Sequence, residues 1–395
     1  MSEYQYYEFL AIDRPLEPED MAALRQITSR ASITPTRLCN VYHWGDFRGD
    51  PRALIVRYFD AFVYLANWGT RRLMLKLPRA AVEPEDLSPY AVDQTLSIEV
   101  GRDHVLLEFL CDDEETSDWI EDQEAEAWMP SLAPLRAEVV RGDLTALYLA
   151  WLHGAATDPD MADEATEPAV PAGLRKLSAP CRVLCDFLGI DQELVAAAAE
   201  RSPVAPHADL SPEALRASVK ALSVAQKDDW IVRLATGSGA GVEAEITRHL
   251  RRAQASPGTR EEQPKPRTAA ELCARAEALK EARAAREARA AEEARKKRAR
   301  IEAAAKERRL IELEGNEGKT WRQIEELVTQ KKQNTYARAA DLLVDLRALA
   351  ERQGDVAAFE ARLAKLRAVH GQKHALIRRL REKGLLAPSI RGDRS

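Results

Sequence analysis

The residues best suited to chemistry lie in one aromatic and polar segment, Tyr42–Phe47. The segment holds a histidine and a carboxylate, His43 and Asp46, which would form a general base and its orienting group if their side chains met in space. Further polar and aromatic residues follow after a stretch of apolar chain. A candidate pocket for ligand binding or acid–base catalysis is therefore defined by seven residues: His43, Trp44, Asp46, Asn67, Trp68, Arg71 and Arg72.

Two features favour a binding surface over a catalytic centre in this pocket. Adjacent residues of an extended segment point to opposite sides, and no Ser or Cys lies in a recognised nucleophile elbow. We expect Trp44 and Phe47 to be buried in a packing corner and His43 to face solvent, so that Trp44→Ala would cost about 3 kcal/mol. We assign no catalytic residue, and an enzyme centred on His43 and Asp46 is kept as an alternative.

Two pairs of possible metal ligands have helical spacing. Cys181 and Cys185 would lie on one face of a helix, but a closed zinc site needs four ligands. The nearest further candidate, His207, stands apart beyond two prolines. His370 and His374 are separated by a glycine at which a helix should end. We therefore expect the two cysteines to be buried core thiols, and we assign no metal.

The glycine-rich stretches do not match a phosphate-binding loop. Gly237–Gly241 lacks the lysine and the preceding strand that such a loop requires, and a helix break is the simpler interpretation. Gly315–Thr320 ends in Gly-Lys-Thr, but the first glycine of the motif would fall on Leu313 in an expected helix. We therefore assign no nucleotide or other cofactor.

The segment Thr268–Leu313 predicts one long charged helix. It contains no Gly, Pro or aromatic residue, and it pairs opposite charges such as Glu292 and Lys296 at i,i+4. Such a helix would run about 70 Å, and its heptad positions are too polar for a stable coiled coil by themselves. We favour a solvated spacer, with a nucleic-acid site as the alternative, because phosphates bind clustered bases. The strongest basic cluster is Arg295, Lys296, Lys297, Arg298 and Arg300.

The first third of the chain mixes strand and helix patterns. Asp50 followed by Pro51 predicts the start of a central helix that ends before Gly69. The expected elements are a strand at Tyr4–Ile12, helices at Glu19–Arg30 and Arg52–Asn67, a strand at Thr70–Leu77, and a hairpin of Thr95–Val100 with His104–Leu110. This order predicts a small α+β domain with a largely antiparallel sheet.

Strand patterns disappear from Pro130 onward, and the remainder is expected to be mainly helical. Pro-bearing stretches separate the helical segments, and Thr320–Gln323 matches a capping box that would open a C-terminal helix. The expected organisation is an α+β domain at 1–128, a helical extension at 129–157, a linker at 158–173, a helical domain at 174–253, a second linker at 254–267, a long charged helix at 268–314 and a helical bundle at 315–395.

The composition of the 395 residues, 45% hydrophobic and 31% charged, narrows the class of protein. No window approaches 18 apolar residues, and the N-terminal residues lack a signal pattern, so we expect a cytoplasmic protein with no membrane segment. Five cysteines do not suggest a disulfide framework. Nine acidic residues and no basic residue lie between Asp112 and Glu126. The range from Arg267 to Arg309 holds 14 Lys or Arg and 8 Glu.

The C-terminal half resembles the non-zinc helical region of bacterial SWIM zinc-finger proteins. The phrases that carry the likeness are VPAGLRKLSAPCRVLCDFLGIDQELVAAAA at 170–199, SVAQKDDWIVRLATG at 223–237 and the long run at 321–385 that begins WRQIEELVTQ. The family's C-x-C zinc ligands are missing, so zinc binding is not carried over. N-terminal phrases such as YEFLAIDRPL resemble uncharacterised bacterial proteins. The resemblance implies that this protein associates with nucleic-acid-processing assemblies.

These patterns predict a non-enzymatic, cytoplasmic interaction or scaffold protein. It would link an N-terminal α+β binding domain to a helical C-terminal module and would bind a protein partner. The alternatives are a nucleic-acid-associated accessory factor that uses the basic helix, and an enzyme with a site around His43 and Asp46.

Overall fold

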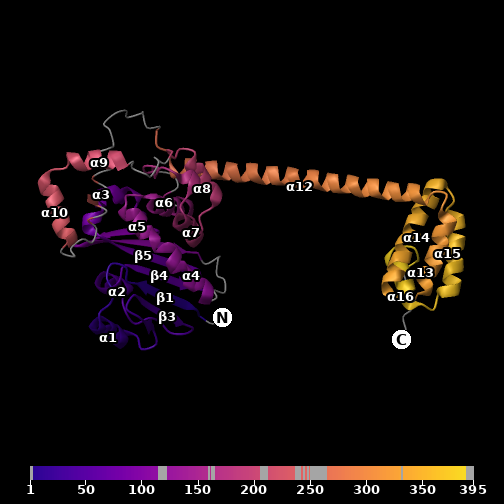
Figure 1. Ribbon diagram of the computed structural model, residues 1–395, viewed down its shortest axis with the longest axis horizontal. Helices are drawn as coiled ribbons and strands as arrows, with labels where there is room; N and C mark the ends of the chain where they lie inside the picture. Colours follow the sequence, from indigo (N-terminus) through magenta and orange to yellow (C-terminus); the bar gives the residue numbers. More distant parts are fainter. Residues whose placement is uncertain are drawn as a thin grey trace. The chain divides into compact units, whose positions relative to one another are not determined.

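The computed structural model describes residues 3–113, 122–158, 161, 165–204, 212–235, 242, 245–246, 249, 265–330 and 332–387. The chain divides into two compact units, Met1–Arg283 (unit 1) and Ala284–Ser395 (unit 2). Unit 1 begins with an antiparallel sheet and its helices, and the rest of the chain is mainly helical, which confirms the predicted fold class (Figure 1). The predicted break after residue 236, most of the acidic run, most of the second linker and His207 lie outside the described residues.

All neighbouring strands of the sheet are antiparallel, in the order β2-β3-β1-β4-β5-β7-β6. The predicted hairpin is confirmed as β6 and β7. The strands are β1 (Gln5–Leu10), β2 (Ser32–Ile33), β3 (Arg37–Tyr42), β4 (Ala61–Ala66), β5 (Thr70–Pro78), β6 (Leu96–Val100) and β7 (His104–Asp112).

The predicted central helix Arg52–Asn67 is wrong in its second half. Helix α2 spans Pro51–Tyr58 and begins as predicted, with the Asp50 carboxylate accepting a hydrogen bond from the Arg52 amide. The chain then enters β4, which lies between β1 and β5 and is buried along its whole length. A strand buried on both faces is continuously apolar, and so is a helix with a wide apolar face, which explains the error.

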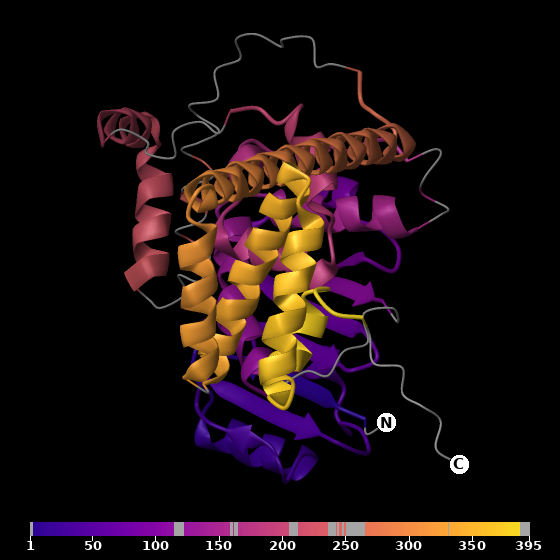
Figure 2. The same ribbon diagram turned by 90° about the vertical axis from the view of Figure 1, so that its right-hand side faces the viewer.

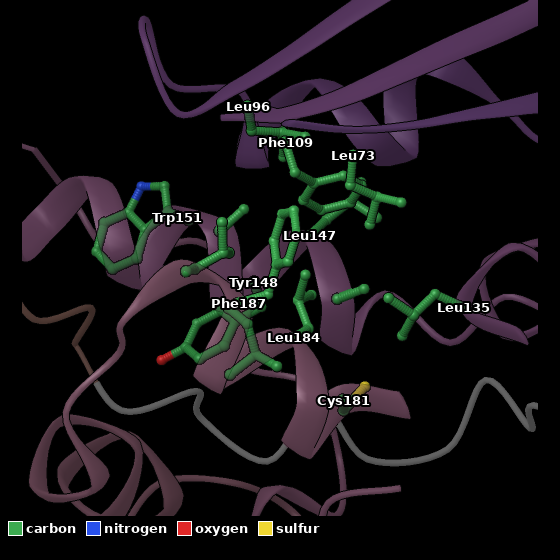
Figure 3. Close-up of a cluster of buried hydrophobic side chains, with 14 of the residues drawn as sticks. Leu73, Leu96, Phe109, Leu135, Leu147, Tyr148, Trp151, Cys181, Leu184 and Phe187 are labelled. Carbon is green, nitrogen blue, oxygen red and sulfur yellow. The ribbon is translucent and has the colours of Figure 1, made fainter. Parts of the chain in front are cut away.

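One face of the sheet is covered by a layer of helices that forms the main core of unit 1. Figure 3 shows Leu73 and Phe109 from the sheet together with Leu147 from α6 and Leu184 from α7, all of them buried. Helix α6 is apolar nearly all round, because it lies inside this layer. The layer consists of α4 (Asp122–Leu132), α5 (Pro134–Val140), α6 (Thr145–Thr157), α7 (Ala179–Leu188) and α8 (Gln192–Ala199).

The opposite face of the sheet is only partly covered. Helix α1 (Pro18–Ile27) and α2 bury Leu24, Leu54 and Ile55 in a second core with sheet residues such as Phe9. The remaining elements of unit 1 are short: η1 (Arg79–Ala81), α3 (Pro84–Leu87), η2 (Ser88–Tyr90), η4 (Leu174–Lys176), α9 (Pro212–Ala221) and α10 (Val224–Ala235).

The long charged helix is confirmed as α12 (Ala269–Leu313), and its first turns belong to unit 1. Thr268 and Glu271 form a capping box, in which each side chain accepts a hydrogen bond from the other's amide. Beside it, Arg267 makes a buried ion pair of 2.7 Å with Glu167, which also accepts the Tyr148 hydroxyl at 2.6 Å. Leu272 is fully buried in the main core, so packing as well as helix propensity holds this end of α12.

Unit 2 contains the rest of α12 and a bundle of four shorter helices (Figure 2). Its core gathers apolar residues such as Trp321, Leu343 and Leu376. The predicted capping box at Thr320 is wrong, because α13 begins earlier and the Thr320 hydroxyl donates to the carbonyl of Asn316 inside the helix. The bundle consists of α13 (Glu317–Thr329), α14 (Gln333–Gln353), α15 (Val356–His370) and α16 (His374–Glu382).

Candidate functional site

Two neighbouring rows of side chains cross the partly covered face of the sheet. The first, the apolar row, is packed under α2, and the second, the polar row, lies one pair of residues further along each strand. The apolar row is Leu38, Phe9, Phe62 and Met74. The polar row is Asn40, Tyr7, Tyr64 and Arg72. Because paired residues of neighbouring strands share a face, the polar row brings hydroxyl, amide and guanidinium groups side by side.

A pocket of about 670 Å³ opens over the polar row. Two loops complete its walls. The β3–α2 loop contributes Asp46 and Phe47, and the short β4–β5 loop contributes Trp68. Gly45 and Gly69 adopt positive φ angles of 79° and 100°, which allow the backbone of both loops to turn sharply. The volume lies in the range of small-molecule and side-chain binding sites.

A hydrogen-bond network fixes the floor of the pocket. The Tyr7 hydroxyl lies 2.8 Å from Asp46 Oδ1 and 2.8 Å from Gln5 Oε1, and it has one proton for the two acceptors. The Tyr64 hydroxyl donates to Gln5 Oε1 at 3.0 Å, and Gln5 Nε2 donates to the Gly45 carbonyl at 3.0 Å. These bonds tie the β3–α2 loop to β1 and β4, so the position of the Asp46 carboxylate is set by the sheet.

Burial keeps the two tyrosines of the pocket protonated. It raises the pKa of Tyr64 to about 12, with the negative charge of Asp46 acting in the same direction. Burial and the hydrogen bond to Asp46 also raise the pKa of Tyr7 above its ordinary value. Both side chains are therefore neutral hydrogen-bond donors at physiological pH.

Arg72 lines the pocket, and its positive charge is balanced by Glu108. Its Nε and Nη2 donate to Glu108 Oε1 at 2.9 and 2.5 Å. The second carboxylate oxygen of Glu108 pairs with Arg52, which also approaches Glu99 at 3.3 Å. Glu108 is buried and sits between two arginines, an arrangement in which the charges offset one another.

The structure brings together three of the seven residues of the predicted pocket: Asp46, Trp68 and Arg72. His43 is outside it, with its ring 5.7 Å from that of Tyr4, whose side chain packs in the core on the other face of the sheet. His43 is exposed and Phe47 is buried, as predicted.

Trp44 lies outside the pocket, and its expected burial is wrong, because 68% of the residue is exposed. Its ring lies under the Arg30 guanidinium at 4.8 Å, so it covers a charged side chain at the surface. Asn67 and Arg71 also lie elsewhere. Asn67 accepts the Tyr4 amide, and Arg71 donates to the carbonyls of Asp186 and Phe187 at the end of α7.

Sequence reasoning missed the residues that form the floor of the pocket, Gln5, Tyr7 and Tyr64, and also Glu108, which pairs with the lining residue Arg72. Gln5 and Tyr7 share the alternation of the predicted strand Tyr4–Ile12, which could have placed both on one face. Tyr64 was assigned to a helix, so its pairing with Tyr7 and Arg72 could not be inferred.

The lining of the pocket is rich in hydrogen-bonding groups. Among the described residues that line it there is no Ser, Cys, Lys or His. Three of its polar side chains, from Gln5, Tyr7 and Tyr64, are more than nine-tenths buried. Such rigid hydrogen-bonding groups can orient a ligand.

The other predicted sites lie either in the core or among ion pairs at the surface. The Cys181 thiol is buried in the main core, and burial raises its pKa as well as that of Cys185, the latter to about 12. Within the described part of the chain, no three His, Cys, Asp or Glu side chains gather as metal ligands would. The basic cluster of α12 is exposed, and Glu292 pairs with Arg295 at 3.0 Å and Lys296 at 3.6 Å.

Comparison with known proteins found no matching family model, no matching curated protein and no matching solved structure. Of the helices that the structure describes, each is too short or too polar to cross a membrane. The site must therefore be interpreted from its own geometry.

Proposed function

We propose that this protein is a non-enzymatic adaptor that acts in the cytoplasm and binds one partner through unit 1 and another through unit 2. The observation that carries the proposal is the middle of α12. From Ala284 to Arg309 every residue except Glu292 is exposed, so this stretch adds no core to either unit. A helix that is polar on all sides and buries nothing is typical of a spacer between binding modules.

The ends of α12 differ from its middle. Within unit 1, Arg275 pairs with Glu200 at 2.7 Å and Arg283 pairs with Glu193 at 2.7 Å. Within unit 2, Glu307 pairs with Arg352 at 2.7 Å and Leu310 is buried. Both ends of the helix are therefore anchored, and only the stretch between them is free of packing.

The charges of the two units support different partners. Unit 1 holds 31 Lys and Arg against 47 Asp and Glu, a net charge of −16, whereas unit 2 holds 27 against 17, a net charge of +10. Opposite fields attract opposite ligands, so one chain can recruit a cationic partner and an anionic partner.

The test is to insert a protease recognition sequence after Ala290 in the full-length chain and to capture partners from the native host before and after cleavage. We expect two sets of partners that purify together with the uncut protein and separately with the two fragments. The uncut insertion variant controls for the insertion itself. A single set of partners that follows one fragment, or loss of both sets on cleavage, would contradict the adaptor.

A nucleic-acid-associated factor is the second candidate, and the exposure of the basic cluster on α12 favours it. The resemblance of 321–385 to the helical region of SWIM proteins supports the same candidate. Binding of a DNA duplex at about 50 mM salt should weaken steeply as salt rises, because neutralised phosphates release counterions. Changing Lys296, Lys297, Arg298 and Arg300 to Glu should abolish it.

The matched control reverses the same number of exposed charges elsewhere in unit 2, at Lys365, Arg367, Arg378 and Arg381. Equal loss in both variants would point to the general charge of unit 2 and not to the basic cluster. Absence of duplex and single-strand binding at low salt would reject this candidate.

A further inference from the structure

The pocket over the polar row combines two features that together select a ligand by charge. It has an aromatic lining, with Phe47 and Trp68 in its walls and the two tyrosines in its floor, and it has acidic groups at its rim. Aromatic faces and carboxylates in one cavity attract cations, since both present negative potential.

The Asp46 carboxylate has spare capacity to accept hydrogen bonds. Its Oδ1 accepts from the Tyr7 hydroxyl at 2.8 Å and from the Phe47 amide at 2.7 Å. Its Oδ2 has no hydrogen-bond partner among the described residues, and Glu3, also at the rim, has no ion pair among them. A carboxylate in the wall of a cavity that is held by one oxygen and has no bond to the other can pair with an incoming positive group.

Trp68 offers an open aromatic surface at the same cavity. It lies in the β4–β5 loop, where the Gly69 amide donates to the Ala66 carbonyl and closes a tight turn. The residue is 39% exposed, and its ring has no ring or cation contact within the described part of the chain. Tryptophan is the aromatic residue that binds cations most strongly.

Arg72, the cation among the described lining residues, does not reverse this preference. The Arg72 guanidinium is balanced by Glu108, and Glu108 together with Glu99 also balances Arg52. Asp112, paired through an oxygen to the Thr70 hydroxyl at 2.6 Å, adds a further negative charge beside the lining residue Thr70. Among the described lining residues, the charge that is left unbalanced is therefore negative, from Asp46 and Glu3.

We propose that this pocket binds the positively charged end of a ligand, an alkylammonium or guanidinium group, with Asp46 as its counter-ion and Trp68 as its aromatic platform. Such a group occurs on free amines and on the Lys or Arg side chains of a protein. The proposal deepens the adaptor function, since it names the chemistry by which unit 1 recognises its partner. It rests on the adaptor function only in taking that partner to be a protein.

Titration calorimetry of the full-length protein tests the proposal with three probes. N-acetyl-arginine amide should bind saturably, and its uncharged isostere N-acetyl-citrulline amide should bind at least about 10-fold more weakly, because it lacks the charge. Spermidine distinguishes the two sources. Tighter binding of spermidine points to a free polyamine, and tighter binding of the arginine amide points to a protein side chain.

Two variants locate the binding. Asp46→Asn keeps an oxygen for the Tyr7 and Phe47 hydrogen bonds but removes the charge, so we expect binding to weaken about 10- to 100-fold. Trp68→Leu should weaken it about 5-fold. The matched controls are Asp93→Asn and Trp44→Leu, since both residues are exposed and lie outside the pocket.

Equal binding of the arginine and citrulline amides, preferential binding of acetate or phosphate, or unchanged affinity in Asp46→Asn would overturn the proposal. The cleavage experiment separates this failure from failure of the adaptor. If partners still divide between the two fragments and no cation binds, only the assigned ligand class is wrong.

Discussion

The apolar and polar rows of the sheet are neighbours on the same strands and the same face, yet one is packed under a helix and the other lines a pocket. Phe9 and Phe62 of the apolar row pack with ring centroids 4.5 Å apart and are fully buried under α2. Tyr7 and Tyr64, the next pair along the same two strands, have centroids 4.7 Å apart and direct their hydroxyls to Gln5 and Asp46. One step along a strand face thus separates core from candidate site.

The two rows differ because α2 covers the apolar row and does not extend over the polar row. Residues under the helix lose water on all sides, so only apolar side chains are stable there. Residues beyond it have a cavity above them and can keep polar groups, provided that these groups bond one another. The pocket therefore needs no special fold, and it arises where a short helix covers only part of a sheet face.

The largest effect should come from the apolar row. Phe62→Ala should lower the free energy of unfolding of unit 1 by about 3–5 kcal/mol, because it leaves a large void under α2. Tyr64→Phe in the polar row removes one hydrogen bond and should cost only about 1 kcal/mol. Hydrogen exchange of peptides from β1 and β4 measures the stability of unit 1 separately from that of unit 2. Equal losses of stability in the two variants would mean that the polar row is packed as tightly as the apolar row.

A smaller effect is expected where the polar row meets Glu108. Glu108→Gln leaves Arg52 and Arg72 without their shared counter-ion, and it should cost about 2 kcal/mol, less than a fully buried pair because both arginines reach solvent. Glu99→Gln is the control, since Glu99 is exposed and should contribute little. Urea unfolding of the two variants measures the difference. A cost for Glu99→Gln as large as for Glu108→Gln would argue against a central role of Glu108.

Asp60, which lies beyond the apolar row on the side away from the polar row, should respond to acid. Burial raises the pKa of Asp60, but hydrogen bonds from the Asp13 and Ile12 amides and the charge of Lys76 outweigh it, so the pKa lies below its ordinary value. The ionised group therefore stabilises unit 1 above about pH 4, and this contribution is lost as pH falls further through the native pKa. Asp60→Asn should give a shallower loss of stability in acid. Urea midpoints between about pH 2 and pH 7 that fall in parallel for both proteins would refute this assignment.

The smallest effect should come from the surface tryptophan. Trp44→Ala should change stability by less than about 1 kcal/mol, because the residue is mostly exposed and loses chiefly its contact with Arg30. This value replaces the much larger cost expected from the sequence. The shift of the urea midpoint decides between them, with Phe47→Ala, which empties a buried position, as the reference for a large effect.

Elements with one strong local pattern were predictable. Helix α12 follows from Ala and paired charges, and its observed bounds, Ala269–Leu313, lie within one residue of the expected segment. The β6–β7 hairpin and the buried α6 follow from alternation and from a continuous apolar run. Thr320 was misplaced because its capping-box pattern recurs inside helices, and only the start of α13 at Glu317 decides between the two uses.

The candidate site was predicted in part. Asp46, Trp68 and Arg72 were found because aromatic and charged residues cluster in turns beside strands. His43 and Trp44 belong to the same predicted cluster, but they lie outside the pocket, in the bend that follows β3. Tyr7 and Tyr64 are 57 positions apart, and their pairing depends on the register of β1 against β4.

The local features of this protein can be read from its residues: where α12 forms, which strands alternate polar and apolar residues, and where acidic and basic residues gather along the chain. Each depends on residues close in the chain, whose propensities and spacing act without a partner. Contacts between distant parts of the chain make AFVYLA a central strand, let Glu108 bridge two arginines and bring Asp46 and Trp68 to the lining of one cavity. These features depend on strand register and on how far α2 extends over the sheet, and both are set by the packing of the whole domain.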